Sequence, residues 1–159
     1  MILRPNKILK NIYEITPEML KEMGIHALLL DLDSTVMKSK SGEFTKETLE
    51  WFEQFKKDFY MAIVTNNHNQ EYLEKVMAQA PCKVYWGASK PFSNTIKNIV
   101  KGLFMEPKHV VMVGDRPLTD ILAGKCARVK TILVGSIDSK ENWLVRTVRF
   151  IERLTICRF

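Results

Sequence analysis

The sequence predicts an α/β protein in which a parallel, five-stranded sheet lies between two layers of helices, a three-layer Rossmann-like fold. Two patterns predict this class. Short apolar runs of the kind that form buried strands recur along the chain, and segments with apolar residues at helical spacing alternate with them. This alternation favours right-handed crossovers, which place helices on both faces of a parallel sheet. With 159 residues, the chain has the size of one ordinary domain, 1–159.

Five runs are predicted to be strands because they are short, apolar and followed by polar or turn-forming residues. They are residues 26–31, 61–64, 84–86, 110–113 and 131–134. Residues 1–24 are interpreted as an N-terminal extension that precedes the first strand. Within this extension, Thr16 and Pro17 are typical of a helix N-cap and first turn, and Gly24 is typical of a helix end.

The segments between the strands have apolar residues three and four positions apart, which predicts helices. Thr45 is predicted to cap one of these helices. Phe92 is predicted to point inward from a helix over 92–103. A short helix is predicted over about 118–126, and the last helix over 139–156.

The composition favours a cytoplasmic protein. The three cysteines are scattered without a disulfide or metal-ligand pattern, which is typical of a reduced, intracellular chain. The first residues lack the apolar segment of a signal peptide, and no run is long and apolar enough to span a membrane. The chain carries 24 basic and 18 acidic residues, for a formal net charge of +6.

Basic residues are concentrated near the C-terminus, in the predicted helical region 139–159. Arg146, Arg149 and Arg153 share one face of this helix, beside apolar residues and Trp143. Such a helix can lie in the interface of an anionic membrane and make the protein peripheral at the inner face. The same pattern also fits a helix packed on the sheet with a solvated basic face. There is no strong nucleic-acid signal, and the oligomeric state stays open.

Polar side chains follow four of the predicted strands, at the point where each strand ends. They are Asp31 and Asp33 after the first strand, Thr65 after the second, Lys90 after the third, and Asp115 and Asp120 after the fourth. Because the carboxyl ends of parallel strands meet at one edge of a sheet, these groups are expected to converge. Four carboxylates repel one another unless a cation lies among them, and hard oxygen ligands favour Mg²⁺ over zinc.

This set of groups suits phosphoryl chemistry. A lysine and a hydroxyl beside the cation can share the negative charge of a phosphoryl group. One carboxylate can act as nucleophile and form an aspartyl-phosphate, and another can protonate the leaving oxygen and later deprotonate water. Since alternate residues of an extended strand end share a side, Asp31 and Asp33 are both expected to face the site, with Leu32 turned away.

Several of these residues also have simpler interpretations. Thr65 can cap the following helix, Lys90 can be an ordinary surface lysine, and Asp120 can be a first-turn acid beside a helix dipole. The alternative is weaker for Asp31 and Asp33, because two acids directly after a leucine run need a partner.

The residues from Asp31 to Thr35 (DLDST) are similar to the D-x-D-x-T motif of haloacid-dehalogenase-type (HAD) phosphohydrolases. Thr65 resembles the second motif of that superfamily and Lys90 the third. The run GDRPLTD, which ends at Asp120, resembles its G-D-x-x-x-x-D fourth motif. The order of the motifs and their strand context agree, so the resemblance covers nearly the whole chain.

The resemblance implies a role for each site residue. Asp31 would be the nucleophile and a Mg²⁺ ligand, and Asp33 the acid and base with its backbone carbonyl on the metal. Asp115 would be a further metal ligand. The remaining implied roles are phosphate contacts for Thr65, Asn66 and Lys90, and a supporting role for Asp120, which would orient Lys90 or reach the metal through water.

Within this superfamily, the chain resembles the small YqeG-type phosphatases of subfamily IIIA, which include relatives that act on phosphatidylglycerophosphate. The likeness includes the run from Ile12 to Pro17, Thr-Asn-Asn after the second strand, and the fourth motif. Two positions depart from the family pattern. Ser34 stands where Asn is usual, and Arg116-Pro117 stand in place of Gln-Leu, so loop geometry or substrate preference can differ.

The spacing of the motifs predicts a site without a cap domain. Thr35 and Thr65 are only about 30 residues apart, and an independent unit below ~40 residues rarely folds unaided. An open site fits a phosphate on something large, such as the lipid phosphatidylglycerophosphate. The alternatives are a phosphatase for a phosphoprotein, nucleotide or nucleic-acid end, and a non-catalytic HAD-fold binding or scaffold protein.

Overall fold

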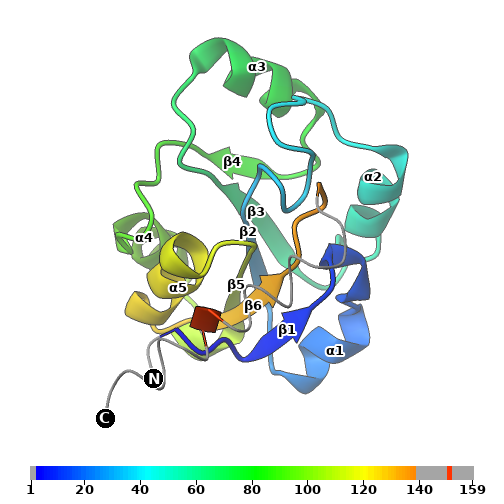
Figure 1. The fold of residues 1–159 in the computed structure, drawn as a ribbon. Helices are drawn as coiled ribbons and strands as arrows, with labels where there is room; N and C mark the ends of the chain where they lie inside the picture. The colour runs from blue at the N-terminus through cyan, green and yellow to red at the C-terminus, as the bar shows by residue number, and fades with distance from the viewer. Residues whose placement is uncertain (1–2, 139–149, 152–159) are drawn as a thin grey trace.

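The computed structural model describes residues 3–138 and 150–151, and it contains one parallel, six-stranded sheet in the order β1-β6-β5-β2-β3-β4 (Figure 1). The strands are β1 Lys7–Leu9, β2 Ala27–Leu30, β3 Tyr60–Val64, β4 Lys83–Tyr85, β5 Val110–Gly114 and β6 Lys130–Val134. Together with the helices on its two faces, this sheet confirms the predicted three-layer, Rossmann-like class.

The sheet has one strand more than the five that the sequence predicts. The additional strand, β1, belongs to the segment interpreted as an extension, and it pairs with β6 so that Ile8 lies opposite Leu133. Three residues are too few to show a two-residue hydrophobic period, and β1 contains no fully buried side chain. Its pairing depends instead on a distant contact. A side chain at Gly135 would collide with the carbonyl oxygen of Lys10, so glycine is required beside this strand.

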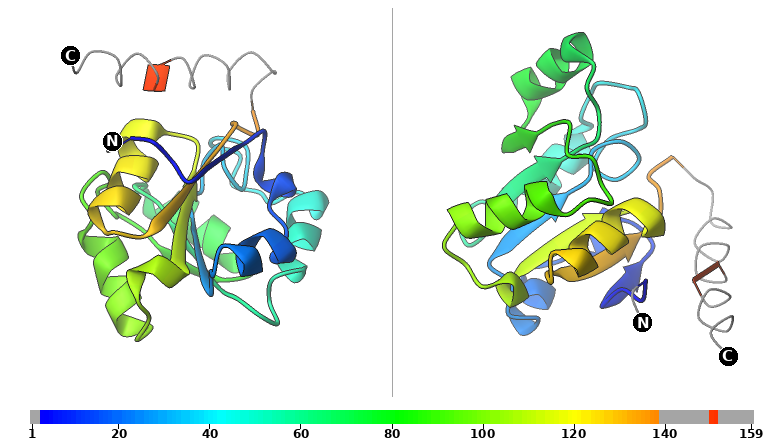
Figure 2. Two further views of the ribbon diagram at one scale, coloured as in Figure 1. Left: turned by 90° about the horizontal axis from the view of Figure 1, so that it is seen from below. Right: turned by 90° about the vertical axis from the view of Figure 1, so that its left-hand side faces the viewer.

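Helices cover both faces of the sheet (Figure 2). They are α1 Pro17–Glu22, α2 Lys46–Glu53, α3 Gln70–Gln79, α4 Asn94–Gly102 and α5 Leu122–Cys126, with short helical turns η1 Ile12–Glu14, η2 Pro107–His109 and η3 Pro117–Ile121. The views of Figure 2 show α1 and α2 on one face and α4 and α5 on the other. In accordance with this, Leu20 of α1 and Trp51 of α2 belong to one buried cluster, and Ile96 of α4 belongs to a second.

Side chains of the central strands alternate between these two clusters. In β2, Leu28 and Leu30 face the cluster under α1 and α2, whereas Ala27 and Leu29 face the cluster under α4 and α5. Both faces of the strand are therefore apolar, which explains the continuous hydrophobic run in the sequence. The same alternation occurs in β3 and β5, the two strands that flank β2.

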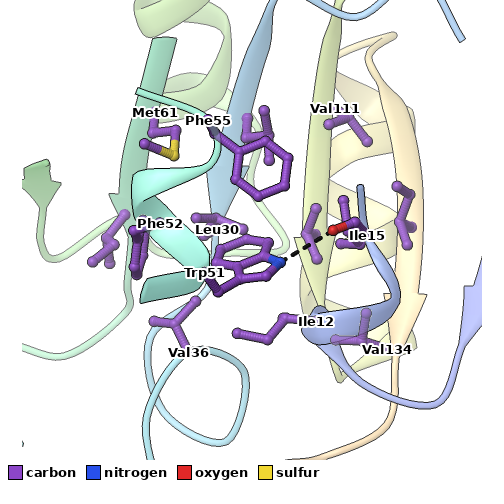
Figure 3. Close-up of a cluster of buried hydrophobic side chains, with 14 of the residues drawn as sticks. Ile12, Ile15, Leu30, Val36, Trp51, Phe52, Phe55, Met61, Val111 and Val134 are labelled. Atoms are coloured by element: carbon purple, nitrogen blue, oxygen red, sulfur yellow. Dashed lines mark hydrogen bonds between the residues drawn. The ribbon is translucent and has the colours of Figure 1, made fainter. Parts of the chain in front are cut away.

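The buried indole of Trp51 in the first cluster is anchored by an internal hydrogen bond. Trp51 is 3% exposed, and its indole Nε1 donates to the carbonyl oxygen of Ile15 at 3.1 Å (Figure 3). The Phe55 ring packs against the indole with centroids 4.7 Å apart. Since the only polar atom of the indole is paired, Trp51 adds a large apolar area to the core without an unsatisfied donor.

The predicted N-caps are confirmed. Thr16 Oγ1 accepts a hydrogen bond from the Met19 amide, and Thr45 Oγ1 accepts one from the Thr48 amide, both at 3.2 Å. The inward orientation predicted for Phe92 is wrong, because α4 begins two residues later at Asn94 and Phe92 is 72% exposed.

Other predicted helices differ from the structure or lie beyond it. The segment predicted as one helix over 118–126 consists of a π-helical turn, η3, followed by α5. The helix predicted over 139–156 lies outside the described residues, except for Phe150 and Ile151. Among the helices that are described, none is long and apolar enough to cross a membrane.

Candidate active site

Loops after four parallel strands form the candidate site at the carboxyl edge of the sheet. Asp31 directly follows β2, and its amide donates to the Val113 carbonyl at 2.9 Å, so the chain is still in register with β5 where the carboxylate begins. The Thr65 amide donates in the same way to Tyr85, at 2.9 Å. Because β5, β2, β3 and β4 are successive neighbours in the sheet, the loops that follow them lie side by side.

The central contact of the site is a buried ammonium group between two carboxylates. Lys90 Nζ lies 2.7 Å from Asp31 Oδ1 and 2.6 Å from Asp120 Oδ1. The side chains of Lys90 and Asp120 are 2% and 1% exposed, and that of Asp31 is 13% exposed. Lys90 is therefore not a surface lysine, and its charge is neutralised by residues that are 59 and 30 positions away in the chain.

Asn66 fixes the backbone from which Lys90 extends. The Asn66 side-chain amide donates to the Lys90 carbonyl at 2.9 Å, and its Oδ1 accepts from the Lys90 amide at 2.7 Å. Asn66 was predicted as a phosphate contact. The Asn66 side chain thus positions the Lys90 backbone; its Nδ2 has a second hydrogen that Lys90 does not use, and the phosphate contact stays a prediction.

Asp120 is held over the end of β5. Its Oδ2 accepts a hydrogen bond from the Arg116 amide at 3.1 Å, while its other oxygen contacts Lys90. A side chain at Gly114 would collide with the Asp120 carboxylate, so the glycine is what allows this close approach. The GDRPLTD run thus begins at Gly114, the last residue of β5, and continues into the turn η3, which returns Asp120 to the strand end.

A cluster of three carboxylates can hold a cation. Oxygen atoms of Asp31, Asp115 and Asp120 all lie within 4.8 Å of one another. Asp115 is 4% exposed, and Thr35 Oγ1 donates to its Oδ1 at 3.4 Å. This cluster contains the predicted ligands Asp31 and Asp115. It also includes Asp120, which was predicted only to support the site.

The electrostatics of the cluster fit a bound cation. Burial raises the pKa of Asp31 to about 6, Asp120 adds to the rise, and Lys90 opposes it. Burial likewise raises the pKa of Asp115 to about 7, with further contributions from Asp120 and Asp31. Burial alone would lower the pKa of Lys90, but the two aspartates outweigh this effect and raise it. One ammonium does not compensate three carboxylates, whereas a divalent cation would.

Asp33 lies outside this carboxylate cluster. Its Oδ1 accepts hydrogen bonds from the Tyr72 hydroxyl at 2.7 Å and from the Lys40 amide at 3.1 Å. Leu32, between the two predicted catalytic acids, is buried in the core as expected. The chain turns directly after Asp33, since Ser34 has a left-handed backbone with φ of 67°.

The predicted phosphate contact Thr65 is 3% exposed at the end of β3. Its Oγ1 accepts a hydrogen bond from the Asn67 amide at 3.2 Å, which leaves the hydroxyl hydrogen able to be donated elsewhere. The alternative that Thr65 caps the next helix does not hold, because Asn69 caps α3 through its side chain.

Asp138, which holds the loop that follows β2, was not identified from the sequence. Asp138 Oδ2 accepts from the Ser34 hydroxyl at 2.8 Å and from the Ser39 amide at 2.9 Å, and the Ile137 amide donates to Ser34 at 2.8 Å. The segment after β6 therefore braces the loop that follows the first catalytic motif. No local pattern signals this contact, because its partners are 104 and 99 residues apart.

Comparisons with known proteins agree with this geometry. The HAD-hydrolase-like family model matches residues 87–150. A protein of Bacillus subtilis (strain 168) named "Probable phosphatase YqeG" is 30% identical over 149 residues, which are 94% of this chain and 87% of the relative.

A plant protein and a solved structure extend the comparison. Phosphatidylglycerophosphate phosphatase 1, chloroplastic/mitochondrial, of Arabidopsis thaliana is 25% identical over 98% of this chain, which spans 47% of that relative. The crystal structure of an uncharacterized protein from Listeria monocytogenes serotype 4b has a TM-score of 0.60 at 18% identity, over 73% of this chain and 84% of the other. At this identity, the structural likeness shows a shared fold.

Because the carboxylates of the cluster repel one another, we predict that removing the charge of Asp115 stabilises the fold in the absence of a cation. The folded-state pKa of Asp115 lies near 7, above the ordinary 3.8, so ionisation of this group destabilises the fold increasingly as the pH rises through that range. At about pH 8 in EDTA, we expect Asp115→Asn to raise the melting temperature by about 5 °C. Millimolar Mg²⁺ should raise the melting temperature of the wild type and have little effect on the variant.

Differential scanning calorimetry with and without Mg²⁺ measures both effects. Asp58→Asn is the matched control, because Asp58 is a half-exposed carboxylate in a surface ion pair with Lys21. We expect that variant to stay within about 1 °C of the wild type and to keep the Mg²⁺ response. A lower melting temperature for Asp115→Asn in EDTA, or a wild-type response to Mg²⁺ in that variant, contradicts the interpretation.

Proposed function

Because the chain belongs to the YqeG family of HAD-type phosphatases, we propose that it is a Mg²⁺-dependent phosphomonoesterase that works through an aspartyl-phosphate on Asp31. The observation that carries this proposal is Lys90, buried between Asp31 and Asp120. A buried ammonium beside a strand-end carboxylate lowers the repulsion that a phosphate dianion meets when it approaches that carboxylate.

Asp31 is the proposed nucleophile. A carboxylate oxygen of Asp31 forms a bond to phosphorus while the bond from phosphorus to the ester oxygen breaks. The proposed phosphate contacts are the Lys90 ammonium, beside Asp31, and the Thr65 hydroxyl, which can still donate its hydrogen; both would stabilise charge on the phosphoryl oxygens. A water molecule then attacks the aspartyl-phosphate, which releases inorganic phosphate and restores the Asp31 carboxylate.

Asp33 is the proposed acid and base. In its protonated form it gives a proton to the leaving ester oxygen, and as a carboxylate it then takes a proton from the attacking water. Asp31 precedes it by two residues, and the left-handed turn at Ser34 follows it. Asp31 contacts the Lys90 ammonium, whereas Asp33 accepts from the Tyr72 hydroxyl and the Lys40 amide. These different surroundings suit two different roles.

The carboxylates of Asp31, Asp115 and Asp120 fit a hard divalent cation, and we propose Mg²⁺, as such oxygen-only donors favour. When bound, the ion would neutralise charge that develops on the phosphoryl group. The ligand set proposed from the family resemblance, with the Asp33 carbonyl in place of the Asp120 carboxylate, is an alternative that uses the same centre.

A lipid phosphate such as phosphatidylglycerophosphate is the proposed substrate. One support is the plant relative, whose name identifies phosphatidylglycerophosphate as what it dephosphorylates. Another is the chain itself. The segment between β2 and β3 contains the single helix α2, so we propose an open site without a cap domain, which would admit a head group that stays in its membrane.

Exposed apolar residues on the site loops support contact with a membrane. Trp86, Phe92 and Leu118 are 48%, 72% and 52% exposed. Trp86 directly follows β4, Phe92 lies two residues beyond Lys90, and Leu118 lies in η3 with Asp120. An aromatic side chain that stays exposed in water is typical of a membrane-interface anchor when basic residues accompany it.

Basic side chains lie on two of the loops that form the site, those after β2 and β5. Lys38 and Lys40 are exposed on the loop that follows Asp33, and Arg116 is exposed beside Asp115. Their charge complements anionic phospholipids. We therefore propose a cytoplasmic protein that binds peripherally to the inner face of an anionic membrane. The basic segment 139–159 is a proposed additional contact.

Phosphate release tests the reaction and the substrate together. In Mg²⁺, we expect release from p-nitrophenyl phosphate and, with higher kcat/KM, from phosphatidylglycerophosphate in mixed micelles. EDTA should abolish both, and Asp31→Asn should lower both by at least about 10³-fold, because the nucleophile is lost. Asp58→Asn serves as the matched control and should retain wild-type rates.

The outcomes separate the competing functions. Hydrolysis of p-nitrophenyl phosphate without hydrolysis of the lipid refutes the lipid substrate, and a panel of a phosphopeptide, a nucleotide and a phosphorylated oligonucleotide then identifies the class. A folded wild-type protein that hydrolyses none of these compounds refutes catalysis and favours a binding or scaffold protein.

Vesicle binding tests the exposed apolar residues. We expect the protein to co-sediment with vesicles that contain phosphatidylglycerol, and Trp86→Ser and Phe92→Ser each to weaken binding about fivefold, because each removes interfacial apolar area. Phe104→Ser is the matched control, since Phe104 is 97% exposed but lies between α4 and β5, at the opposite edge of the sheet. Equal loss of binding in the Phe104 variant would refute a membrane face at the site loops.

A further inference from the structure

Tyr72 contacts the proposed acid and base residue directly, and no sequence motif singled it out for a role in the reaction. Its hydroxyl donates to Asp33 Oδ1 at 2.7 Å, from a position 39 residues further along the chain. The same Asp33 oxygen accepts from the Lys40 amide at 3.1 Å. Within the described part of the chain, both hydrogen bonds to the Asp33 carboxylate thus go to Oδ1, and none is given to Oδ2.

Tyr72 is itself fixed by its surroundings. It lies in the first turn of α3, where its amide donates to the N-cap Asn69 at 3.1 Å, and its ring packs against the core cluster under α2. The Tyr72 hydroxyl also lies 3.3 Å from Met37 Sδ. Gly42 has a left-handed backbone, and a Cβ added at this position would lie 3.4 Å from the Tyr72 ring. The loop between β2 and α2 therefore runs close beside this ring. The Tyr72 backbone is therefore fixed in α3, while its hydroxyl contacts Met37 and Asp33 on the loop that follows β2.

We propose that Tyr72 is a positioning residue for the phosphatase reaction, which holds Asp33 Oδ1 as a fixed acceptor and leaves Oδ2 as the oxygen that carries the transferred proton. This inference rests on the proposed function, because it assigns a partner to the Asp33 acid and base. The two oxygens of the Asp33 carboxylate would then have different roles, Oδ1 in positioning and Oδ2 in proton transfer. A carboxylate fixed through one oxygen loses rotational freedom, and the other oxygen then keeps one direction toward the leaving group.

The proton balance of the step follows from this assignment. Protonated Asp33 Oδ2 gives its proton to the ester oxygen as the bond between that oxygen and phosphorus breaks and the bond from Asp31 to phosphorus forms. Oδ2 is then unprotonated and takes a proton from water as the oxygen of that water attacks phosphorus and the bond to Asp31 breaks. Tyr72 keeps its proton throughout. Burial and the bond to Asp33 both raise the pKa of Tyr72, which favours this neutral form.

The leaving group supplies a sensitive test of this role. A nitrophenolate leaves without a proton, whereas the alkoxide of an alkyl phosphate requires a general acid. We expect Tyr72→Phe to lower kcat for glycerol 3-phosphate about tenfold more than kcat for p-nitrophenyl phosphate. Both rates are measured on the same preparation in Mg²⁺, so partial unfolding lowers both and leaves their ratio unaffected.

Two further variants complete the experiment. Tyr13→Phe is the matched control, because it removes a hydroxyl that contacts Thr48 at 2.8 Å, away from Asp33, and should keep the wild-type ratio. Asp33→Asn should shift the ratio at least as much as Tyr72→Phe. In the double variant, the Tyr72 substitution should add no further shift, since it acts only through Asp33.

The outcomes distinguish this inference from the proposed function. If Asp33→Asn shifts the ratio and Tyr72→Phe does not, the positioning role is refuted and the reaction stands. If Tyr72→Phe raises kcat for glycerol 3-phosphate, the tyrosine holds Asp33 away from the substrate, which also refutes the role. If the wild type hydrolyses neither compound, or Asp33→Asn leaves the ratio unshifted, the proposed reaction fails together with this inference.

Discussion

The ammonium of Lys90 between Asp31 and Asp120 is the interaction on which the site depends. Removing one partner from such a buried group leaves an unpaired charge, which destabilises a fold by roughly 3–5 kcal/mol. Several otherwise unrelated features serve this contact. Asn66 holds the Lys90 backbone through two hydrogen bonds, and Gly114 makes room for the Asp120 carboxylate. Residues from the ends of four strands thereby take part in one charge arrangement.

The Lys90 ammonium does not neutralise all of the carboxylates at the site. Asp115 adds a further buried carboxylate to the pair that Lys90 joins, and its raised pKa reflects burial together with the nearby acids. The three carboxylates can bind a cation, and the Lys90 ammonium beside Asp31 would attract a phosphate group. The neighbouring loops carry exposed apolar and basic side chains, and on this ground we propose contact with an anionic lipid interface.

Much of this site could be predicted because the carboxyl ends of parallel strands meet at one edge of the sheet. A leucine run followed by Asp31 indicates both a buried strand and a polar edge, and the same logic applies to Asp115. Side-chain pairing could not be predicted in the same way. The partners of Asp33 and Ser34, Tyr72 and Asp138, are 39 and 104 residues distant, and each depends on where a loop turns. The strand β1 was missed because its three residues are too few to show a hydrophobic pattern, and its pairing with β6 depends on residues far away in the chain.

Trapping the covalent intermediate tests the central claim most directly. The protein is mixed with p-nitrophenyl phosphate and Mg²⁺, quenched in acid, digested and analysed by mass spectrometry. We predict the added mass of one phosphoryl group on the peptide that contains Asp31, in larger amount in Asp33→Asn, where water is no longer deprotonated, and none in Asp31→Asn. Phosphate release without this adduct in Asp33→Asn, or an adduct on another residue, would contradict the account.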